Sequence, residues 1–168
     1  MRIAIDYSSA VLQQAGIGRY TRNLIGALAK LDHDTPYVLF SAGRDLQPPA
    51  WPENFVRREL PLSNRYVLKA WHRVKLGIPI ELFTGKVDLF HSPDFVLPPT
   101  LAARKVLTIH DLSFIRYPHC SSPGLLRYLL KAVPPSIRRA DHLLADSENT
   151  RNDLVELLGV AQERITVL

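Results

Sequence analysis

Short apolar runs of strand length alternate along this chain with segments whose apolar residues recur every three or four positions. The strand-like runs are Arg2–Asp6, Tyr37–Phe40, Phe55–Leu60, Val87–Ser92, Lys105–Asp111, His142–Ser147 and Arg164–Leu168. Strands that are apolar almost throughout, with helices between them, are typical of a parallel sheet that is buried on both faces. The sequence therefore predicts an α/β, Rossmann-like fold with a mostly parallel sheet, helices on both faces, and Phe55–Leu60 nearer an edge.

Three helices follow from the same pattern. Ile17–Leu31 has its apolar residues on one face, and Arg65–Phe83 shows a similar division into apolar and basic sides. Leu125–Arg139 is predicted to be a helix that is kinked or divided at Pro134–Pro135, because proline removes a helical hydrogen bond. A fourth helix is expected to begin after Ser147 as its N-cap and to end at Gly159.

Length and composition indicate one ordinary globular domain. A chain of 168 residues can bury its own core, and 46% hydrophobic with 22% charged residues argues against disorder. The single cysteine, Cys120, excludes an internal disulfide and a multi-cysteine metal site. No stretch approaches the roughly 20 apolar residues of a membrane span, and the start turns polar too soon for a signal peptide. We therefore expect a cytoplasmic protein.

The net charge of +5 and the pI near 9.6 favour acidic partners, although solubility alone explains such a balance equally well. Arg65, Lys69 and Arg73, together with Arg138 and Arg139, could form basic faces that bind an anionic membrane surface. A solvated helix face is the competing explanation. Basic residues interleaved with aromatic ones are not evident, so we expect no nucleic-acid partner.

Polar side chains follow four of the predicted strands, at the edge where open parallel sheets bind ligands. They are Asp6, His91 with Ser92, His110 with Asp111, and Asp146 with Ser147. Polar residues also end strands for structural reasons, so the combination counts for more than any single member. His110 is the strongest candidate, since a histidine at the rim of a buried strand can exchange a proton or polarise a ligand oxygen.

Neighbouring strand residues point to opposite faces, so Asp111 is not automatically the partner of His110. Arg151 lies one turn into the helix that Ser147 opens, where it can reach the ligand edge or remain solvated. No pair of residues has the spacing of metal ligands, and we expect no metal.

The stretch AGIGRY places Gly16 and Gly18 at the start of the predicted helix that follows the first strand. A dinucleotide fingerprint needs a third glycine where Thr21 stands, and a P-loop needs a lysine that is missing here. Glycines still allow a close approach of the backbone to a ligand, helix N-terminal amides attract an anion, and Arg19 adds a cationic donor. A plain turn with a helix cap explains the same residues.

Together these segments resemble the N-terminal domain of group 1 glycosyltransferases, the retaining, nucleotide-sugar-dependent enzymes of the GT-B fold, and mannosyltransferase-like members most of all. The matching stretches are IDYSSA…GIGRYTRNL, DLFHSPDFVLPP, VLTIHDLSFIRYPH and RRADHLLADSENTRNDLVELLGVAQERITVL. They follow one another in the family's order over nearly the whole chain.

The resemblance implies that residues 1–168 form the acceptor-side half of a two-domain enzyme whose C-terminal donor-binding domain is absent from this chain. It also implies that the loop at Gly16, Gly18 and Arg19 approaches the donor diphosphate and that His110 lies beside the transferred sugar. The remaining residues expected on the acceptor side or the cleft are Asp6, His91, Asp94, Asp111, Ser147 and Arg151.

The implied partners are a nucleotide-sugar, a glycan or lipid-linked acceptor, and the chain's own C-terminal domain, without a metal or other cofactor. We expect the chain to stop at the interdomain hinge and to be inactive alone. The alternative is a non-catalytic Rossmann-like module that binds a phosphorylated ligand.

Overall fold

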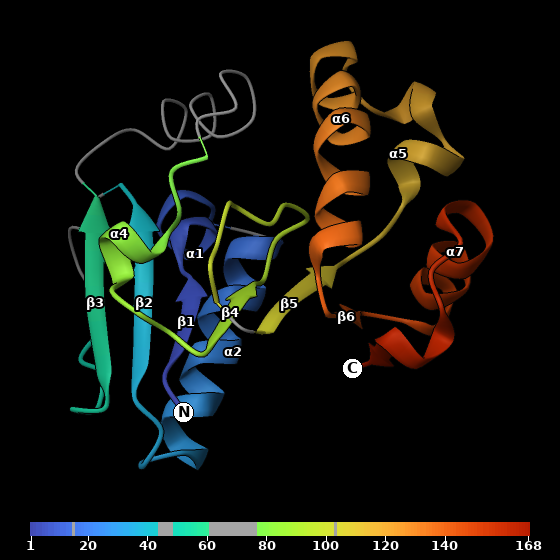
Figure 1. Cartoon of the computed structure of the whole chain (residues 1–168). Helices are drawn as coiled ribbons and strands as arrows, with labels where there is room; N and C mark the ends of the chain where they lie inside the picture. Colours follow the sequence, from blue (N-terminus) through green and yellow to red (C-terminus); the bar gives the residue numbers. More distant parts are fainter. Residues whose placement is uncertain (15, 44–48, 61–76, 103) are drawn as a thin grey trace. The chain divides into compact units, whose positions relative to one another are not determined.

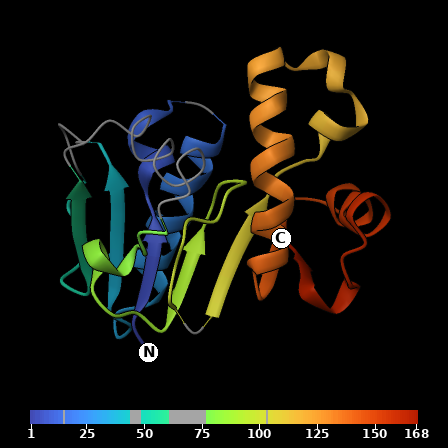
Figure 2. The same ribbon diagram turned by 45° about the horizontal axis from the view of Figure 1, so that its top comes forward.

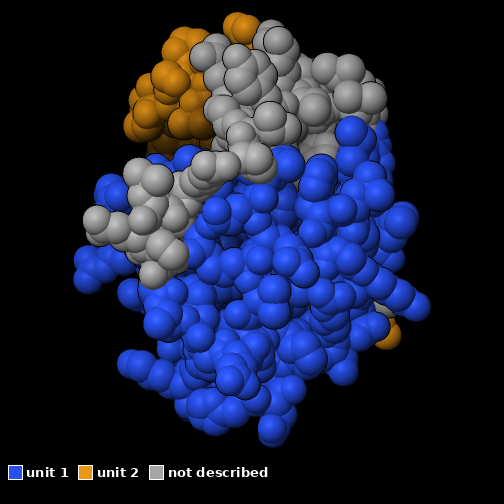
Figure 3. Space-filling model, turned by 90° about the vertical axis from the view of Figure 1, so that its left-hand side faces the viewer, with its two compact units in different colours: residues 1–93, 98–103 blue, residues 94–97, 104–168 orange. Residues whose placement is uncertain are grey.

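The computed structural model describes residues 1–14, 16–43, 49–60, 77–102 and 104–168. The chain forms two compact units, which Figure 3 shows in different colours, and Figure 1 labels their helices and strands. Unit 1 contains Met1–Pro93 and Pro98–Ala103, and unit 2 contains Asp94–Leu97 and Arg104–Leu168. Within each unit every described strand pair is parallel, which confirms the predicted α/β, Rossmann-like class.

The described residues of unit 1 form four strands in the order β3-β2-β1-β4. Their bounds are β1 Ile3–Asp6, β2 Tyr37–Ala42, β3 Phe55–Leu60 and β4 Leu89–Ser92. β1 is central, because Ile5 lies opposite Leu39 of β2 on one side and His91 of β4 on the other. β3 pairs only with β2 among the strands of this unit, as its weak apolar alternation predicted.

Helices cover both faces of the unit 1 sheet, as Figures 1 and 2 show. On one face, Ile5 and Leu39 pack in a buried cluster with Ile25 of helix α2 (Ile17–Leu31). On the other face, Phe40 contacts Phe83 of the short helix α4 (Glu81–Thr84), with ring centroids 5.8 Å apart. α2 begins and ends where the periodicity placed it. The five-residue helix α1 (Ser8–Leu12) was not predicted.

The predicted helix Arg65–Phe83 is wrong in its described part. Residues 61–76 lie outside the described residues, but 77–80 are not helical and only Glu81–Thr84 forms a turn of helix. Pro79 explains the break, since it cannot donate a backbone hydrogen bond and disfavours helix in the residue before it.

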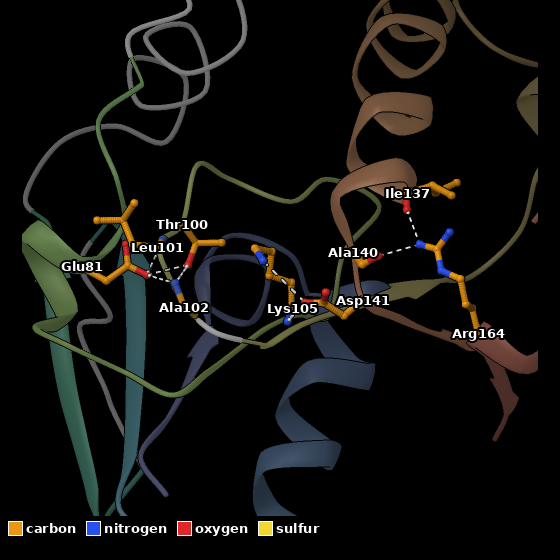
Figure 4. A network of polar contacts seen from close by, with 9 residues as sticks. All are labelled: Glu81, Thr100, Leu101, Ala102, Lys105, Ile137, Ala140, Asp141 and Arg164. Atoms are coloured by element: carbon orange, nitrogen blue, oxygen red, sulfur yellow. Dashed lines mark hydrogen bonds and ion pairs between the residues drawn. The ribbon is translucent and has the colours of Figure 1, made fainter.

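Glu81 fixes the loop at the end of unit 1, as Figure 4 shows. Its Oε1 accepts hydrogen bonds from the Thr100 hydroxyl at 2.5 Å and from the amides of Leu101 and Ala102 at 2.9 Å each. Because one oxygen takes three donors, the loop over 100–102 is anchored to α4.

Unit 2 holds three strands in the order β5-β6-β7. Its elements are β5 Arg104–Ile109, α5 Ser113–Arg116, the 3₁₀ turns Pro118–Cys120 and Gln162–Arg164, α6 Pro123–Arg139, β6 His142–Ala145, α7 Glu148–Leu158 and β7 Ile165–Val167. α7 follows Ser147 and ends at Gly159, which adopts a left-handed φ of 63°, as predicted.

α6 is one undivided helix, so the division expected at Pro134 and Pro135 is wrong (Figures 1 and 2). The two prolines leave the carbonyls of Leu130 and Lys131 without their helical amide partners. Both residues are exposed, so water can satisfy these carbonyls at little cost.

Two side chains tie the starts of β5 and β7 to the C-terminal end of α6 (Figure 4). The Lys105 amide donates to Asp141 Oδ2 at 2.7 Å, directly after α6. Arg164, just before β7, donates to the carbonyls of Ile137 and Ala140 at 3.0 and 2.5 Å. These bonds fix α6 relative to the amino ends of the strands. The carboxyl ends of the strands take no part in them.

In the described part of the chain, no helix combines the length and the apolar character that crossing a bilayer requires.

Candidate functional site

The carboxyl ends of β5 and β6 bring His110 and Asp146 together. The two strands pair in parallel with Ile109 opposite Ala145, so the next residue of each strand lies beside the other. His110 Nδ1 lies 2.6 Å from Asp146 Oδ2, which makes a short hydrogen bond between an imidazole and a carboxylate. The His110 side chain is 11% exposed and that of Asp146 35%.

The main chain of His110 is held by α7. The Thr150 hydroxyl donates to the His110 carbonyl at 2.9 Å and lies 3.0 Å from the Ser147 hydroxyl. The Ser147 hydroxyl also accepts from the Thr150 amide at 3.1 Å, so Ser147 is the N-cap that the sequence indicated. Ser147 therefore belongs to the support of His110 as well as to the start of α7.

Asp94 and Phe95 belong to the same unit and lie near this histidine. The Phe95 ring meets the His110 ring edge to face, with centroids 5.5 Å apart. Burial raises the pKa of the Asp94 carboxyl, while the hydrogen bond from the Phe95 amide and the charge of His110 act against that rise. The structure thus gathers Asp94, His110, Asp146 and Ser147 within unit 2.

Two other candidates of unit 2 have local roles. The Asp111 carboxylate accepts from the Ser113 amide at 2.8 Å and caps the turn into α5, and the carboxylate on His110 Nδ1 is Asp146. Arg151 donates from Nη2 to Glu148 Oε2 at 2.6 Å, one helical turn away. Its Nε is buried and has no partner among the described residues.

The glycine loop lies in unit 1, between α1 and α2. Gly16 is the N-cap of α2 with φ 56° and ψ −122°, a backbone conformation that favours glycine. No side chain of the described residues caps the first amides of α2, and its first turn holds no acidic residue. Arg19 is exposed in that first turn. This local geometry is suited to an anion.

Gly18 has a structural reason to be glycine. A Cβ there would lie 2.1 Å from the Gln13 carbonyl oxygen and 2.7 Å from that of Ser9. Thr21, which stands in place of a third glycine, is buried, and its hydroxyl lies 2.9 Å from both the Ser9 hydroxyl and the Ile17 carbonyl. The turn that the sequence left as an alternative therefore accounts for Gly18 and Thr21 by packing alone.

Arg22 completes this turn and was not predicted. Its guanidinium donates to the carbonyls of Ala10, Gln13 and Gln14 at 2.5, 2.8 and 2.9 Å. A cation at carbonyls near a helix C-terminus is favourable, and a fork of donors fits several of them at once. Its position one turn beyond a glycine pair was the only signal in the sequence.

Asp6 and His91 end the neighbouring strands β1 and β4 in unit 1. Asp6 accepts from the Ser8 amide at 2.9 Å and thereby opens α1. His91 is buried within its strand, and desolvation lowers its pKa to about 4. A buried, neutral histidine of this kind fits a structural role at β4 better than proton exchange with a ligand.

The basic residues singled out in the sequence differ in their surroundings. Arg65, Lys69 and Arg73 lie outside the described residues. Arg139 donates to the Leu97 carbonyl and so serves unit 2 itself. The described residues contain no group of three or more His, Cys, Asp or Glu side chains arranged to hold a metal ion.

In unit 2, the arrangement orients the His110 imidazole so that it can form a hydrogen bond with a hydroxyl group. In unit 1, the first amides of α2 and the cation of Arg19 can bind an anion. Parallel α/β units that carry such groups at strand ends and at a helix start are typical of Rossmann-like domains, which bind ligands at the carboxyl ends of their strands. The family model for Glycosyltransferase Family 4 matches residues 15–168, and the chain belongs to this family.

A characterised relative is the O-antigen chain mannosyltransferase B of Escherichia coli. It is 27% identical over 169 aligned residues, which cover 89% of this chain and 42% of the relative. The chain thus spans less than half the length of this relative.

Proposed function

We propose that this chain is the acceptor-side domain of a retaining glycosyltransferase that moves a sugar from a nucleotide-sugar to a glycan or lipid-linked acceptor. A donor-binding domain, on the part of the protein that corresponds to the unmatched length of the relative, would supply the rest of the active site. Family membership supports glycosyl transfer, and because the Escherichia coli relative is a mannosyltransferase, mannose is the first sugar to test.

The observation that carries the proposal is the 2.6 Å hydrogen bond between His110 and Asp146 at the carboxyl ends of β5 and β6. A fixed, mostly buried imidazole at this edge is suited to contact a sugar hydroxyl and to stabilise positive charge that develops at the reacting sugar. We propose His110 as the residue that contacts the transferred sugar, without a role as nucleophile, and Asp94 as its neighbour on the acceptor side.

The start of α2 supports a second part of the proposal. The leaving nucleoside diphosphate gains negative charge in the transition state, and uncapped amides near Gly16 with the exposed Arg19 would stabilise it. With these groups in that role, the reaction would need no metal.

A donor screen of the full-length protein tests the proposal. The protein is incubated with GDP-mannose, UDP-glucose and further nucleotide-sugars, and released nucleotide is detected by mass spectrometry. Release with one donor, and its loss by at least about tenfold in His110→Ala, is the expected result. His119→Ala is the matched control, because His119 is an exposed histidine of unit 2 with no part in the site. Undiminished transfer by His110→Ala refutes the proposed role.

The second candidate function is a non-catalytic module that binds a phosphorylated ligand, and the uncapped start of α2 favours it. This candidate predicts tight binding of a nucleoside diphosphate with no transfer from any donor. Isothermal titration of the same full-length protein, with Arg19→Ala as the comparison, separates binding from turnover.

A further inference from the structure

We infer that Asp146 is a positioning residue that holds His110 in a single tautomer, with the proton on Nδ1 and with Nε2 as a hydrogen-bond acceptor for a sugar hydroxyl. The part that concerns the sugar rests on the function proposed above for His110. The part that concerns the tautomer follows from the contacts of unit 2 alone.

The side-chain contact determines where the proton lies. A carboxylate accepts hydrogen bonds and cannot donate them, so in the 2.6 Å contact His110 Nδ1 is the donor and Asp146 Oδ2 the acceptor. A neutral imidazole carries one proton, and a proton on Nδ1 leaves a lone pair on Nε2. His110 therefore accepts a hydrogen bond through Nε2 when the imidazole is neutral.

The surroundings keep the ring in place. The Thr150 hydroxyl holds the His110 carbonyl at 2.9 Å, and the edge-to-face contact with Phe95 limits rotation of the imidazole. Only 11% of the His110 side chain is exposed, so few other ring orientations are accessible. Asp146 thus acts on a histidine whose backbone and ring plane are already fixed, and its own contribution is the tautomer.

The carboxylates of Asp111 and Asp94 accept hydrogen bonds from main-chain amides, whereas that of Asp146 accepts from the His110 ring. Asp111 Oδ1 accepts from the Ser113 amide, and Asp94 Oδ1 accepts from the Phe95 amide at 2.7 Å. The register that sets Ile109 opposite Ala145 is what places Asp146 at Nδ1. The arrangement therefore follows from the sheet itself, which is a rigid support for a functional group.

Asp146→Asn is the decisive variant, because the amide keeps the size of the carboxylate but can donate a hydrogen bond. An amide that donates to Nδ1 favours the opposite tautomer, with the proton on Nε2. Asp146→Glu restores a carboxylate and serves as the conservative comparison. Asp141→Asn is the matched control, since Asp141 is another hydrogen-bonded carboxylate of unit 2, with the Lys105 amide as its donor, and lies at the opposite end of β6.

The first measurement is long-range ¹H–¹⁵N NMR of the histidine rings in the intact protein, above the usual histidine pKa of about 6.5. The His110 signals are assigned by their loss in His110→Ala. We expect a protonated Nδ1 in the wild type and in Asp141→Asn, and a protonated Nε2 in Asp146→Asn. A protonated Nε2 in the wild type, or no change in Asp146→Asn, overturns the inference.

The second measurement is steady-state transfer by the same variants. Asp146→Asn should lower kcat by about tenfold to a hundredfold, the range typical for loss of a partner that orients a functional histidine, with smaller changes in KM. His110→Ala combined with Asp146→Asn should be no slower than His110→Ala alone, because both substitutions disrupt the same pair of interacting residues.

The two measurements separate the two hypotheses. If the tautomer reverses but Asp146→Asn transfers sugar at the wild-type rate while His110→Ala does not, the positioning role is wrong and the proposed function stands. If His110→Ala transfers sugar normally, the proposed function of His110 is wrong, and the NMR result still decides whether Asp146 sets the tautomer.

Discussion

Individual side chains in this domain owe their roles to the strands that present them. His110 and His91 both come at or near the carboxyl end of a parallel strand, yet the ring of His110 forms a hydrogen bond with a carboxylate and His91 is buried in its strand. The sequence predicted both positions from the strand pattern. It could not predict the partner of His110, because the register of β5 against β6 is set by packing between segments far apart in the chain.

His91 makes the stability of the fold dependent on pH. Its pKa is lowered to about 4 by burial, against about 6.5 in an unfolded chain. The unfolded state therefore binds a proton first, and stability that is fully present above pH 6.5 declines as the pH falls towards 4. The full effect is about 3 kcal/mol, because each pKa unit corresponds to about 1.4 kcal/mol.

Urea denaturation at several values between pH 4 and pH 7 measures this effect. The free energy of unfolding of the wild type should fall towards that of His91→Gln as the pH decreases, since glutamine keeps polar atoms but does not titrate. The contributions of all other titratable groups to the pH dependence cancel in the difference between the two proteins. A difference that stays constant over this range contradicts a buried neutral His91.

At the scale of helices and strands, the apolar strand runs and the amphipathic pattern of α2 were predictive, whereas the shortest helix and a pattern interrupted by proline were not. Ile17–Leu31 spans four turns, so its period is unambiguous and α2 has the predicted bounds. α1 has five residues, which are too few to show a period, and its Ser8 and Ser9 are buried polar residues held by hydrogen bonds. The helix expected over Arg65–Phe83 fails at 77–80, where Pro79 overrides the apolar spacing.

The contact between α1 and α2 gives a test at this scale. Gly18→Ala would place a Cβ 2.1 Å from the Gln13 carbonyl oxygen, so the helices must separate, and we expect a loss of about 2 kcal/mol or more. Gly26→Ala is the matched control in the same helix, because no atom lies within 4 Å of its added Cβ. It should stabilise the protein by up to about 1 kcal/mol through helix propensity.

Chemical denaturation of the two variants and the wild type measures both values. Equal stability of Gly18→Ala and Gly26→Ala would contradict the close approach of α1 to α2.

The loop over residues 100–102, which Glu81 anchors to α4, gives a second test. Glu81→Ala removes the acceptor of three hydrogen bonds, and the buried Ala102 amide is left without it, so we expect a loss of about 1–3 kcal/mol. Glu81→Gln keeps an amide oxygen for the same donors and should lose less. The free energies of unfolding of the two variants, from chemical denaturation, provide the comparison. An equal loss in Glu81→Gln and Glu81→Ala would show that the charge of Glu81 matters more than its oxygen.

At the scale of the whole molecule, the positive charge is concentrated in one segment. Residues 112–140 contain five Lys and Arg and no Asp or Glu, whereas the rest of the chain has sixteen of each sign. The net charge of +5 therefore belongs entirely to this segment of unit 2. Two of its cations, Arg116 and Arg139, have protein partners in Asp153 and in the Leu97 carbonyl.

The first half of α6 combines two of the three remaining cations with apolar surface. Arg127 and Lys131 are exposed there, and Leu125 and Leu130 are 50% and 49% exposed. Cations beside exposed apolar side chains on one helix are typical of peripheral contact with anionic lipid. This is a more specific form of the membrane partner expected from composition, and it favours a lipid-linked acceptor for the proposed reaction.

We predict that the protein sediments with vesicles that contain phosphatidylglycerol, and far less with phosphatidylcholine alone. Arg127→Glu combined with Lys131→Glu should weaken binding by roughly thirtyfold or more, because each cation near the surface contributes about 1 kcal/mol. Lys30→Glu combined with Lys86→Glu changes the net charge of the protein equally at exposed positions of unit 1 and should bind nearly as the wild type does. Binding should also fall as salt is raised past physiological strength, since screening then shortens the reach of these charges below about 8 Å. Equal weakening by the two double variants would assign the attraction to net charge alone, and binding that is indifferent to anionic lipid would exclude a membrane role for α6.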